Sequence, residues 1–289
     1  MAENKAKPKK NTPRKADPAT VLGVLLAVGG IVGGLILEKG KIQDILQGTA
    51  AMIVLGGTVG AVLVTTPMPV FMRAVIALQG IFSAPVLSIT ERIETLVGFA
   101  TRARKNGIVS LESDALEVED PFLRKALGLA VDGTDLHELK KMMEIDISIA
   151  EHDDEAAAKV WDAAGGYAPT IGIIGAVMGL IQVMKHLEDI KEVGHGIAVA
   201  FVATVYGVGS ANVLFLPAAQ KLRARIREAV MLKEMTLEGI VGIVEGLNPT
   251  LIRLKLNSFD QPPAKAKKVK AAAAKAPDGS KAQAAPVEG

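Results

Sequence analysis

The sequence predicts an all-α fold, a polytopic membrane protein with four transmembrane helices and a helical cytoplasmic domain. Four stretches contain no Asp, Glu, Lys, Arg or His, and each approaches the ~20 residues that cross a bilayer core as a helix. These stretches are residues 21–37, 45–66, 167–184 and 196–216. Residues 67–166 carry many charged side chains, so this part of the chain is expected outside the lipid.

The composition supports this division and excludes several classes of function. The chain is 49% hydrophobic and 22% charged, which indicates that the two kinds of residue are segregated along it. There is no cysteine, which excludes disulfides, thiol catalysis and cysteine-ligated metals. The formal net charge of +2 is too small to indicate a nucleic-acid partner.

Basic residues predict the orientation in the membrane. They are concentrated in the arm before the first apolar stretch and again directly after the fourth, whereas the short turns 38–44 and 185–195 are balanced or slightly acidic. Both termini and the large loop are therefore expected on the cytoplasmic side. The arm does not look like a cleaved signal peptide, because the first apolar stretch continues to Leu37 without a convincing cleavage site.

The same patterns divide the chain into six segments. Two are transmembrane hairpins, separated by a cytoplasmic helical domain and followed by a cytoplasmic helix; a basic arm precedes them and a disordered Lys/Ala/Pro-rich tail ends the chain. In chain order the segments are residues 1–18 (arm), 19–66 (hairpin), 67–166 (helical domain), 167–216 (hairpin), 217–247 (helix) and 248–289 (tail).

The first hairpin is rich in glycines at a spacing of four residues. Gly29 and Gly33, Gly30 and Gly34, and Gly56 and Gly60 are pairs that allow helix backbones to approach closely. Two interpretations remain open. The glycines either pack the two spans of the hairpin together or form the face of a helix in an oligomer.

The charged loop is expected to be helical throughout. Residues 68–82 are too short and too interrupted by Pro and Arg to cross the membrane, so they predict an amphipathic helix that leaves it. Asn106 and Gly107 end a following helix, and Asp120 caps another that begins at Pro121. Asp135 is expected to cap a further helix over residues 136–161.

No catalytic constellation stands out, so we expect neither an enzyme nor a cofactor or metal. The third and fourth apolar stretches do contain hydroxyl and amide side chains, which either satisfy neighbouring backbone or line a hydrated path. An ion path through a membrane normally needs a titratable group, and these stretches have no acid. Either the chain conducts nothing, or another subunit supplies the acid.

Several motifs resemble the MotA family of flagellar motor stator subunits, within the MotA/TolQ/ExbB superfamily. The resemblance extends from about residue 19 to about residue 247 and includes the second, third and fourth stretches and part of the loop. The motifs are IVLGGTVGA at 53–61, EDPFLR at 119–124, VDG at 131–133, APTIGIIGAVMGL at 168–180, GIAVAFVATVYG at 196–207, and ANVLFLP at 211–217.

The resemblance implies roles for two charged residues of the loop. The segment RKNGIVSLE at 104–112 is similar to the family segment that carries two rotor-facing charges, which fall on Arg104 and Glu112. They would contact charged residues of the rotor protein FliG. The alternative is an ordinary solvated charge pair on a cytoplasmic helix.

The resemblance also implies an ion pathway and its coupling residues. Pro169 and Pro217 match the prolines that the family places at the cytoplasmic ends of its third and fourth spans. Thr204 and Tyr206 fall in the fourth-span motif, and sodium-driven relatives have threonine where this chain has Ala176. Alanine offers no oxygen to a hard cation, which favours protons.

By resemblance, five copies would surround two copies of a MotB-type subunit in the bacterial inner membrane, and MotB's single span would bring the missing aspartate. Proton flow through that acid would produce torque on the rotor. The main alternative is an ExbB/TolQ-type energiser of outer-membrane transport, against which the additional glycine-rich hairpin and residues 104–112 argue. A non-conducting membrane scaffold is a further alternative.

Overall fold

The computed structural model describes residues 14–85 and 89–259, so most of the basic arm and the tail from residue 260 onward lie outside the described residues. The chain forms two compact units. Of the described residues, 14–85 together with 145–230 form the membrane unit, and 89–144 with 231–259 form the extramembrane unit.

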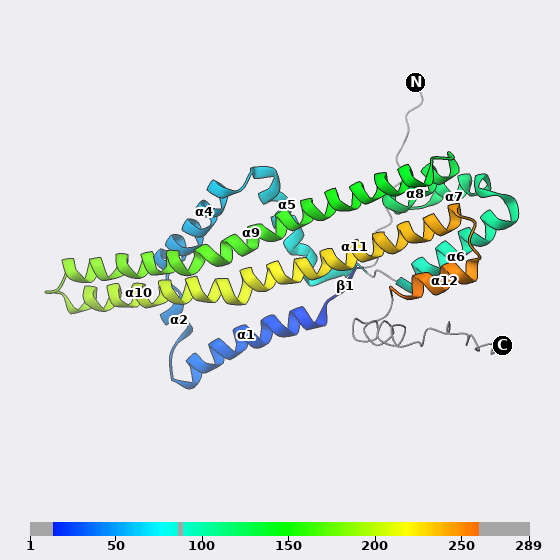
Figure 1. Cartoon of the computed structure of the whole chain (residues 1–289). Helices are drawn as coiled ribbons and strands as arrows, with labels where there is room; N and C mark the ends of the chain where they lie inside the picture. Colours follow the sequence, from blue (N-terminus) through cyan, green and yellow to red (C-terminus); the bar gives the residue numbers. More distant parts are fainter. Residues whose placement is uncertain (1–13, 86–88, 260–289) are drawn as a thin grey trace, which may run out of the picture. The chain divides into compact units, whose positions relative to one another are not determined.

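Four helices are long and apolar enough to cross a membrane, which confirms the predicted fold class (Figure 1). The first is α1, Pro18–Leu37. The second runs from Gly48 to Thr65 as α3 (Gly48–Ala51), the π-helical η1 (Met52–Gly56) and α4 (Gly57–Thr65), after the short α2 (Ile42–Ile45). The third lies in α9, Leu136–Lys185, and the fourth in a helix over Ile190–Val244. That last helix consists of α10 (Ile190–Ser210), the π-helical η3 (Ala211–Phe215) and α11 (Leu216–Val244).

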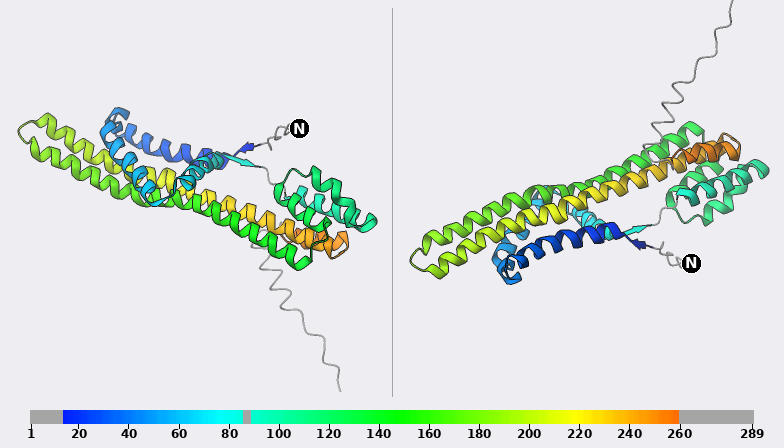
Figure 2. Two further views of the ribbon diagram at one scale, coloured as in Figure 1. Left: turned by 90° about the horizontal axis from the view of Figure 1, so that it is seen from above. Right: turned by 90° about the horizontal axis from the view of Figure 1, so that it is seen from below.

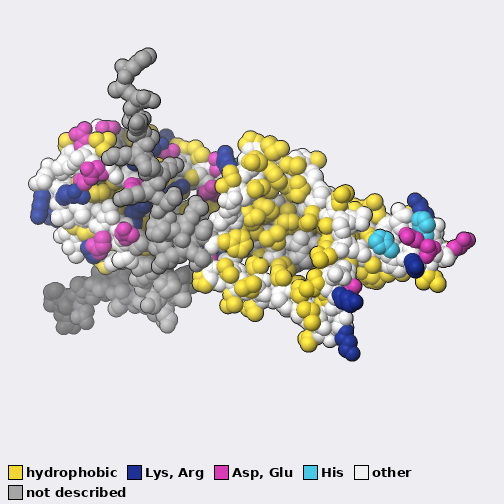
Figure 3. Space-filling model, turned by 180° about the vertical axis from the view of Figure 1, so that it is seen from behind, with side chains coloured by type: hydrophobic (Ala, Val, Ile, Leu, Met, Phe, Trp, Pro, Cys, Tyr) yellow, Lys and Arg dark blue, Asp and Glu magenta, His cyan; other side chains and the backbone are white. Residues whose placement is uncertain are grey.

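The membrane unit presents a mostly hydrophobic surface, and charged and histidine side chains gather at the tip where α9 meets α10 (Figure 3). Hydrophobic side chains of all four spans are exposed within the chain, including Leu26 (67%) in α1 and Phe201 (72%) in α10. Water does not tolerate so large a continuous apolar surface, whereas lipid or other membrane subunits do.

Helices α9 and α10 lie side by side and antiparallel, and small residues bring their backbones together (Figure 2). A Cβ added at Gly172 would lie 2.9 Å from the carbonyl oxygen of Ala203, and one at Gly179 would lie 2.7 Å from that of Gly196. One added at Gly207 would lie 2.6 Å from the Ala168 carbonyl oxygen. No side chain fits at these positions without moving backbone, so this contact, here called the glycine seam, requires glycine.

The glycine pairs singled out in the first hairpin behave differently. Space for a Cβ is open at Gly29, Gly30, Gly33 and Gly34, and α1 has no buried residue. Gly56 and Gly60 are also open, although Gly57 faces Ile171 of α9. Packing of the two spans against each other therefore does not explain these pairs.

The amphipathic helix predicted over residues 68–82 is present as α5, Met68–Phe82. Trp161 of α9 holds it in the membrane unit, since its indole Nε1 donates to the Ala74 carbonyl oxygen at 3.0 Å. The Trp161 ring also stacks on Phe215, with 5.9 Å between ring centroids. One side chain thus joins α5, α9 and the fourth-span helix.

Three local features differ from the sequence-based expectation. Helix α9 runs without interruption from residue 136 through Pro169, where two separate helices were expected. Two three-residue strands, β1 (Arg14–Ala16) and β2 (Ser83–Pro85), pair antiparallel in an otherwise helical chain. The segment expected to be disordered from 248 begins with α12, Pro249–Asn257, because Asn248 caps it and Ile252 and Leu256 are buried four residues apart.

The extramembrane unit is a helical body with its own core. Its elements are α6 (Ile89–Asn106), the 3₁₀ turn η2 (Ile108–Leu111), α7 (Glu112–Glu117), α8 (Pro121–Val131), α12 and the ends of α9 and α11. The predicted helix signals are confirmed: α6 ends before Gly107 at φ 83°, and the Asp120 carboxylate accepts from the Phe122 N–H at 2.9 Å. Fully buried side chains form the core, among them Leu96, Leu111, Leu127, Leu139, Met143, Met235 and Ile240.

The glycine seam predicts a specific sensitivity to one added methyl group. Gly207→Ala should destabilise the protein by about 1–3 kcal/mol, because its Cβ would overlap backbone of α9. Gly209→Ala, two residues along the same helix, meets open space and should be neutral or slightly stabilising. Thermal unfolding of the two purified variants in one detergent measures the difference, and equal midpoints would contradict the seam.

Candidate functional site: the α9–α10 pair and the α6–α7 turn

The polar residues expected along an ion pathway lie on α9 and α10 and carry no charge. Thr204 is half-buried on α10, and its hydroxyl donates to the Ala200 carbonyl oxygen at 3.2 Å. Ala176 is half-buried on α9. Among the described residues, no group of three or more His, Asp or Glu side chains could hold a metal ion. Within their apolar stretches, residues 167–184 and 196–216, the two helices can provide hydroxyls to a path, but not a titrating acid.

Tyr206, also expected in the pathway, is engaged with the start of the second span. Its hydroxyl donates to the Ile45 carbonyl oxygen at 2.6 Å and accepts from the Gln47 N–H at 3.3 Å. These bonds join backbone groups that precede α3 to the last turns of α10, so Tyr206 positions the second span against the fourth.

Gln47 is a polar residue of this region that sequence reasoning did not single out. Its side-chain Oε1 is buried and has no hydrogen-bond partner among the residues that the structure describes. The only amide side chain in the stretch 45–66 was the available signal. Its Oε1 is thus a buried acceptor that the described residues leave unsatisfied.

The two prolines lie inside long helices. Pro169 is inside α9, and a Cβ added at Gly207 would lie only 3.2 Å from the Pro169 Cα. Pro217 is the second residue after the π-helical turn η3. Proline lacks an N–H and its ring clashes with the carbonyl four residues earlier, and a π-helical turn relieves that conflict. Both positions interrupt helical hydrogen bonding close to the seam.

Just beyond Pro217, the basic residues that predicted the orientation are paired with acids of the membrane unit. Arg223 binds Asp162 and Glu155, the latter at 2.8 Å from its Nε. Lys221 Nζ lies 2.5 Å from a carboxylate oxygen of Asp17, the N-cap of α1. The hydrogen bond from Lys221 lowers the pKa of Asp17 to about 2, so the carboxylate stays charged and its contribution to stability is lost only as the pH falls below about 4 toward 2.

Arg104 and Glu112 lie on either side of η2, at the end of α6 and the start of α7. Both side chains are exposed, and neither forms an ion pair within the part of the chain that the structure describes. Two residues outside them on each side, Arg102 pairs with Asp114 at 2.7 Å, and its guanidinium lies 5.3 Å from the Phe99 ring centroid. The structure thus fixes the α6–α7 turn with one ion pair and leaves the two expected contact charges available.

Comparison with known proteins identifies the family. A model of the MotA/TolQ/ExbB proton channel family matches residues 114–235, and one of the motility protein A N-terminal region matches residues 21–107. Motility protein A of Helicobacter pylori is 37% identical over 85% of this chain and 96% of its own length. That of Bacillus subtilis is 32% identical over 83% of this chain and 89% of its own.

The chain belongs to the motility protein A family. Solved structures agree: a chain of C. jejuni MotAB superposes with a TM-score of 0.81 at 35% identity, covering 85% of this chain and 98% of that one. A chain of the Bacillus subtilis flagellar MotAB stator complex superposes with a TM-score of 0.78 at 32% identity over 87% and 98%. The chain is therefore a flagellar stator subunit of the inner membrane, and the match to the N-terminal model disfavours the ExbB/TolQ alternative.

The Tyr206 bonds predict a loss of stability in Tyr206→Phe. Removing the hydroxyl leaves the Ile45 carbonyl and the Gln47 N–H without this partner, which should cost about 1 kcal/mol. Tyr167, the other tyrosine of the chain, is a matched control, because no hydrogen bond of its hydroxyl is found among the described residues. Tyr167→Phe should unfold as the wild type does in detergent, and a Tyr206→Phe midpoint that matches it would contradict the anchoring role.

Proposed function

We propose that this subunit forms, with a MotB-type partner, a proton-conducting stator that converts ion flow into torque, and that it is not an enzyme. The observation that carries the proposal is the seam between α9 and α10. It lies beside uncharged hydroxyls but contains no acid, while relatives of the same fold occur in MotAB complexes. A single-span partner that brings an aspartate would complete the path.

The exposed surface of α1 and its open glycines support assembly with further copies around that partner. We infer five copies around two partner spans, with both termini and the extramembrane unit in the cytoplasm. The basic residues after the fourth span support this orientation. Within such a ring, the open glycine face of α1 allows another helix or lipid to approach closely.

The coupling between proton and torque would use the irregular turns of the helices. Pro169 lies against Gly207, and the π-helical turn η3 precedes Pro217. Each of the two long helices that leave the membrane therefore has a site of weakened backbone hydrogen bonding. A protonation event on the partner's acid could bend them there. The rotor protein FliG would receive the movement through Arg104 and Glu112.

Charge reversal tests the rotor contact. Arg104→Glu and Glu112→Lys should each reduce swimming in a complemented deletion strain, because each turns an attraction to the rotor into a repulsion. Lys105→Glu and Glu117→Lys are matched controls, since both residues are exposed on the same elements. Unaltered motility in both single variants and in the double variant would remove the assignment.

Ala176 gives the prediction on the driving ion. The methyl group at this position on α9 offers no oxygen ligand to sodium, so swimming speed should not depend on external sodium at constant ionic strength and pH. Speed should instead fall when a protonophore collapses the proton gradient. A speed that rises with sodium and resists the protonophore would show that the ion is sodium.

A further inference from the structure

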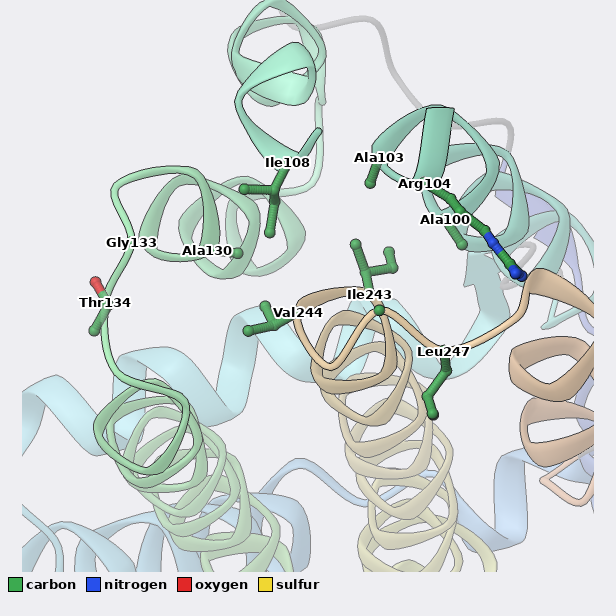
Figure 4. Close-up of a pocket in the computed structure, with 11 residues that line it drawn as sticks. Ala100, Ala103, Arg104, Ile108, Ala130, Gly133, Thr134, Ile243, Val244 and Leu247 are labelled. Atoms are coloured by element: carbon green, nitrogen blue, oxygen red, sulfur yellow. The ribbon is translucent and has the colours of Figure 1, made fainter. Parts of the chain in front are cut away.

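The extramembrane unit contains an apolar pocket beside Arg104. It has a volume of about 350 Å³ and is formed by α6, η2, the end of α8 and the end of α11 (Figure 4). Ala103, Ile108, Ala130 and Ile243 are among the residues that line it. In Figure 4 the side chains of Ala103, Ile108 and Ile243 point toward the same space. Arg104, the proposed rotor-contact residue, therefore lies beside a pocket that the chain's own side chains do not fill.

The charge at the pocket is positive only. Arg104 is the one charged residue among those that line it, its side chain is exposed, and no ion pair of it is found in the described ranges. In Figure 4 its guanidinium points away from the space that Ala103, Ile108 and Ile243 face, so its charge lies at the edge of the pocket. Glu245 and Asp132 are neighbours in sequence of lining residues but do not line the pocket themselves. An occupant should therefore combine an apolar group with a negative charge.

We propose that this pocket receives an apolar side chain of the rotor protein, from a segment whose neighbouring carboxylate meets Arg104. The inference rests on the proposed function and deepens it. An exposed ion pair alone contributes little affinity, whereas an apolar anchor in a pocket at the centre of a charged rim is how protein interfaces gain both affinity and register. The anchor explains how a contact between two mobile surfaces is held in one place during a step.

The chain offers one rival occupant, its own C-terminal segment. Residues 260–289 follow α12 directly and contain six lysines, including Lys265, Lys267 and Lys268, against three acids. Arg104 at the pocket repels such a segment. Charge complementarity therefore favours an acidic partner over the tail.

Filling the pocket separates this proposal from the charge contact. Ala103→Leu adds three carbons inside the space without changing any charge. We expect the affinity of purified rotor protein for the full stator complex in lipid nanodiscs to fall about tenfold, the loss of one buried aliphatic anchor. The thermal midpoint of the complex should stay unchanged or rise, because an existing hollow is filled.

Thr95→Leu is the matched control, a leucine on the same helix at a residue that does not line the pocket. It should bind the rotor protein as the wild type does, and equal losses in both leucine variants would overturn the proposal. If Ala103→Leu lowers the thermal midpoint, Ile108→Ala is the variant that tests the pocket, because it removes an apolar side chain from the pocket wall without placing extra atoms in the pocket. Wild-type affinity in Ile108→Ala would then overturn the proposal.

Two further outcomes separate the pocket from the proposed function. Wild-type affinity in Ala103→Leu together with a loss in Arg104→Glu overturns the pocket and leaves the rotor contact standing. No loss in either variant contradicts the rotor contact itself. Removal of residues 260–289 tests the tail as the occupant. If this truncation raises the affinity for the rotor protein in the wild type but not in Ala103→Leu, the pocket belongs to the tail and the proposal is overturned.

Discussion

The close approach of α9 and α10 is the constraint on which the rest of the membrane unit depends. Three of its glycines have no room for a Cβ because the backbone of the facing helix occupies that space. In lipid no hydrophobic force drives two apolar helices together, so association relies on van der Waals contact and hydrogen bonds, which a backbone-to-backbone contact maximises. The second span is then placed on this pair, through Gly57 against Ile171 and through the Tyr206 hydroxyl.

The glycine seam also accounts for the absence of charged side chains from the membrane-spanning stretches. Polar side chains there satisfy themselves locally, as Thr204 does with Ala200 and Thr58 with the Val54 carbonyl at 2.6 Å. An aspartate in so tight a contact would be desolvated without a cation in reach. The proposed placement of the acid on a separate helix of a partner subunit would avoid this cost. In that proposal, the chemistry of the path and the rigidity of the housing are divided between two chains.

The sequence predicts those parts of the fold that depend on local chemistry. Apolar length gives the four spans, and Asp120 followed by Pro121 gives the start of α8, because a cap and a proline at the first helical position act within one turn. The sequence does not reveal which glycines pack against another helix, because their spacing identifies a helix face without side chains but not the helix that faces it. Gly29 and Gly33 have the same spacing as helix-packing pairs, yet Gly172 and Gly207 make the contact.

Features that depend on tertiary contact were beyond sequence reasoning. Pro169 alone indicated a helix end, but the packing of α9 against α10 keeps that helix continuous. The resemblance identified Tyr206 as a polar residue of the fourth span, and only its hydrogen bonds at Ile45 and Gln47 show that it anchors another span. Helix α12 was missed because its two buried positions, Ile252 and Leu256, lie in a short stretch that adjoins a Lys/Ala/Pro-rich tail.

The proposed rotor contact requires that the charges of Arg104 and Glu112 be free while the turn that carries them is rigid. The Arg102–Asp114 pair and the cation–π contact with Phe99 fix α6 against α7, and Leu111 is buried between them along the chain. A second ion pair, Arg253 with Glu94, connects α12 to α6, and the guanidinium lowers the pKa of the Glu94 carboxyl, so the pair persists into more acidic solution than an ordinary glutamate would allow. Arg104 and Glu112 therefore present their charges from a braced support, and in the proposed rotor contact their side chains, rather than the backbone, would adapt to the partner.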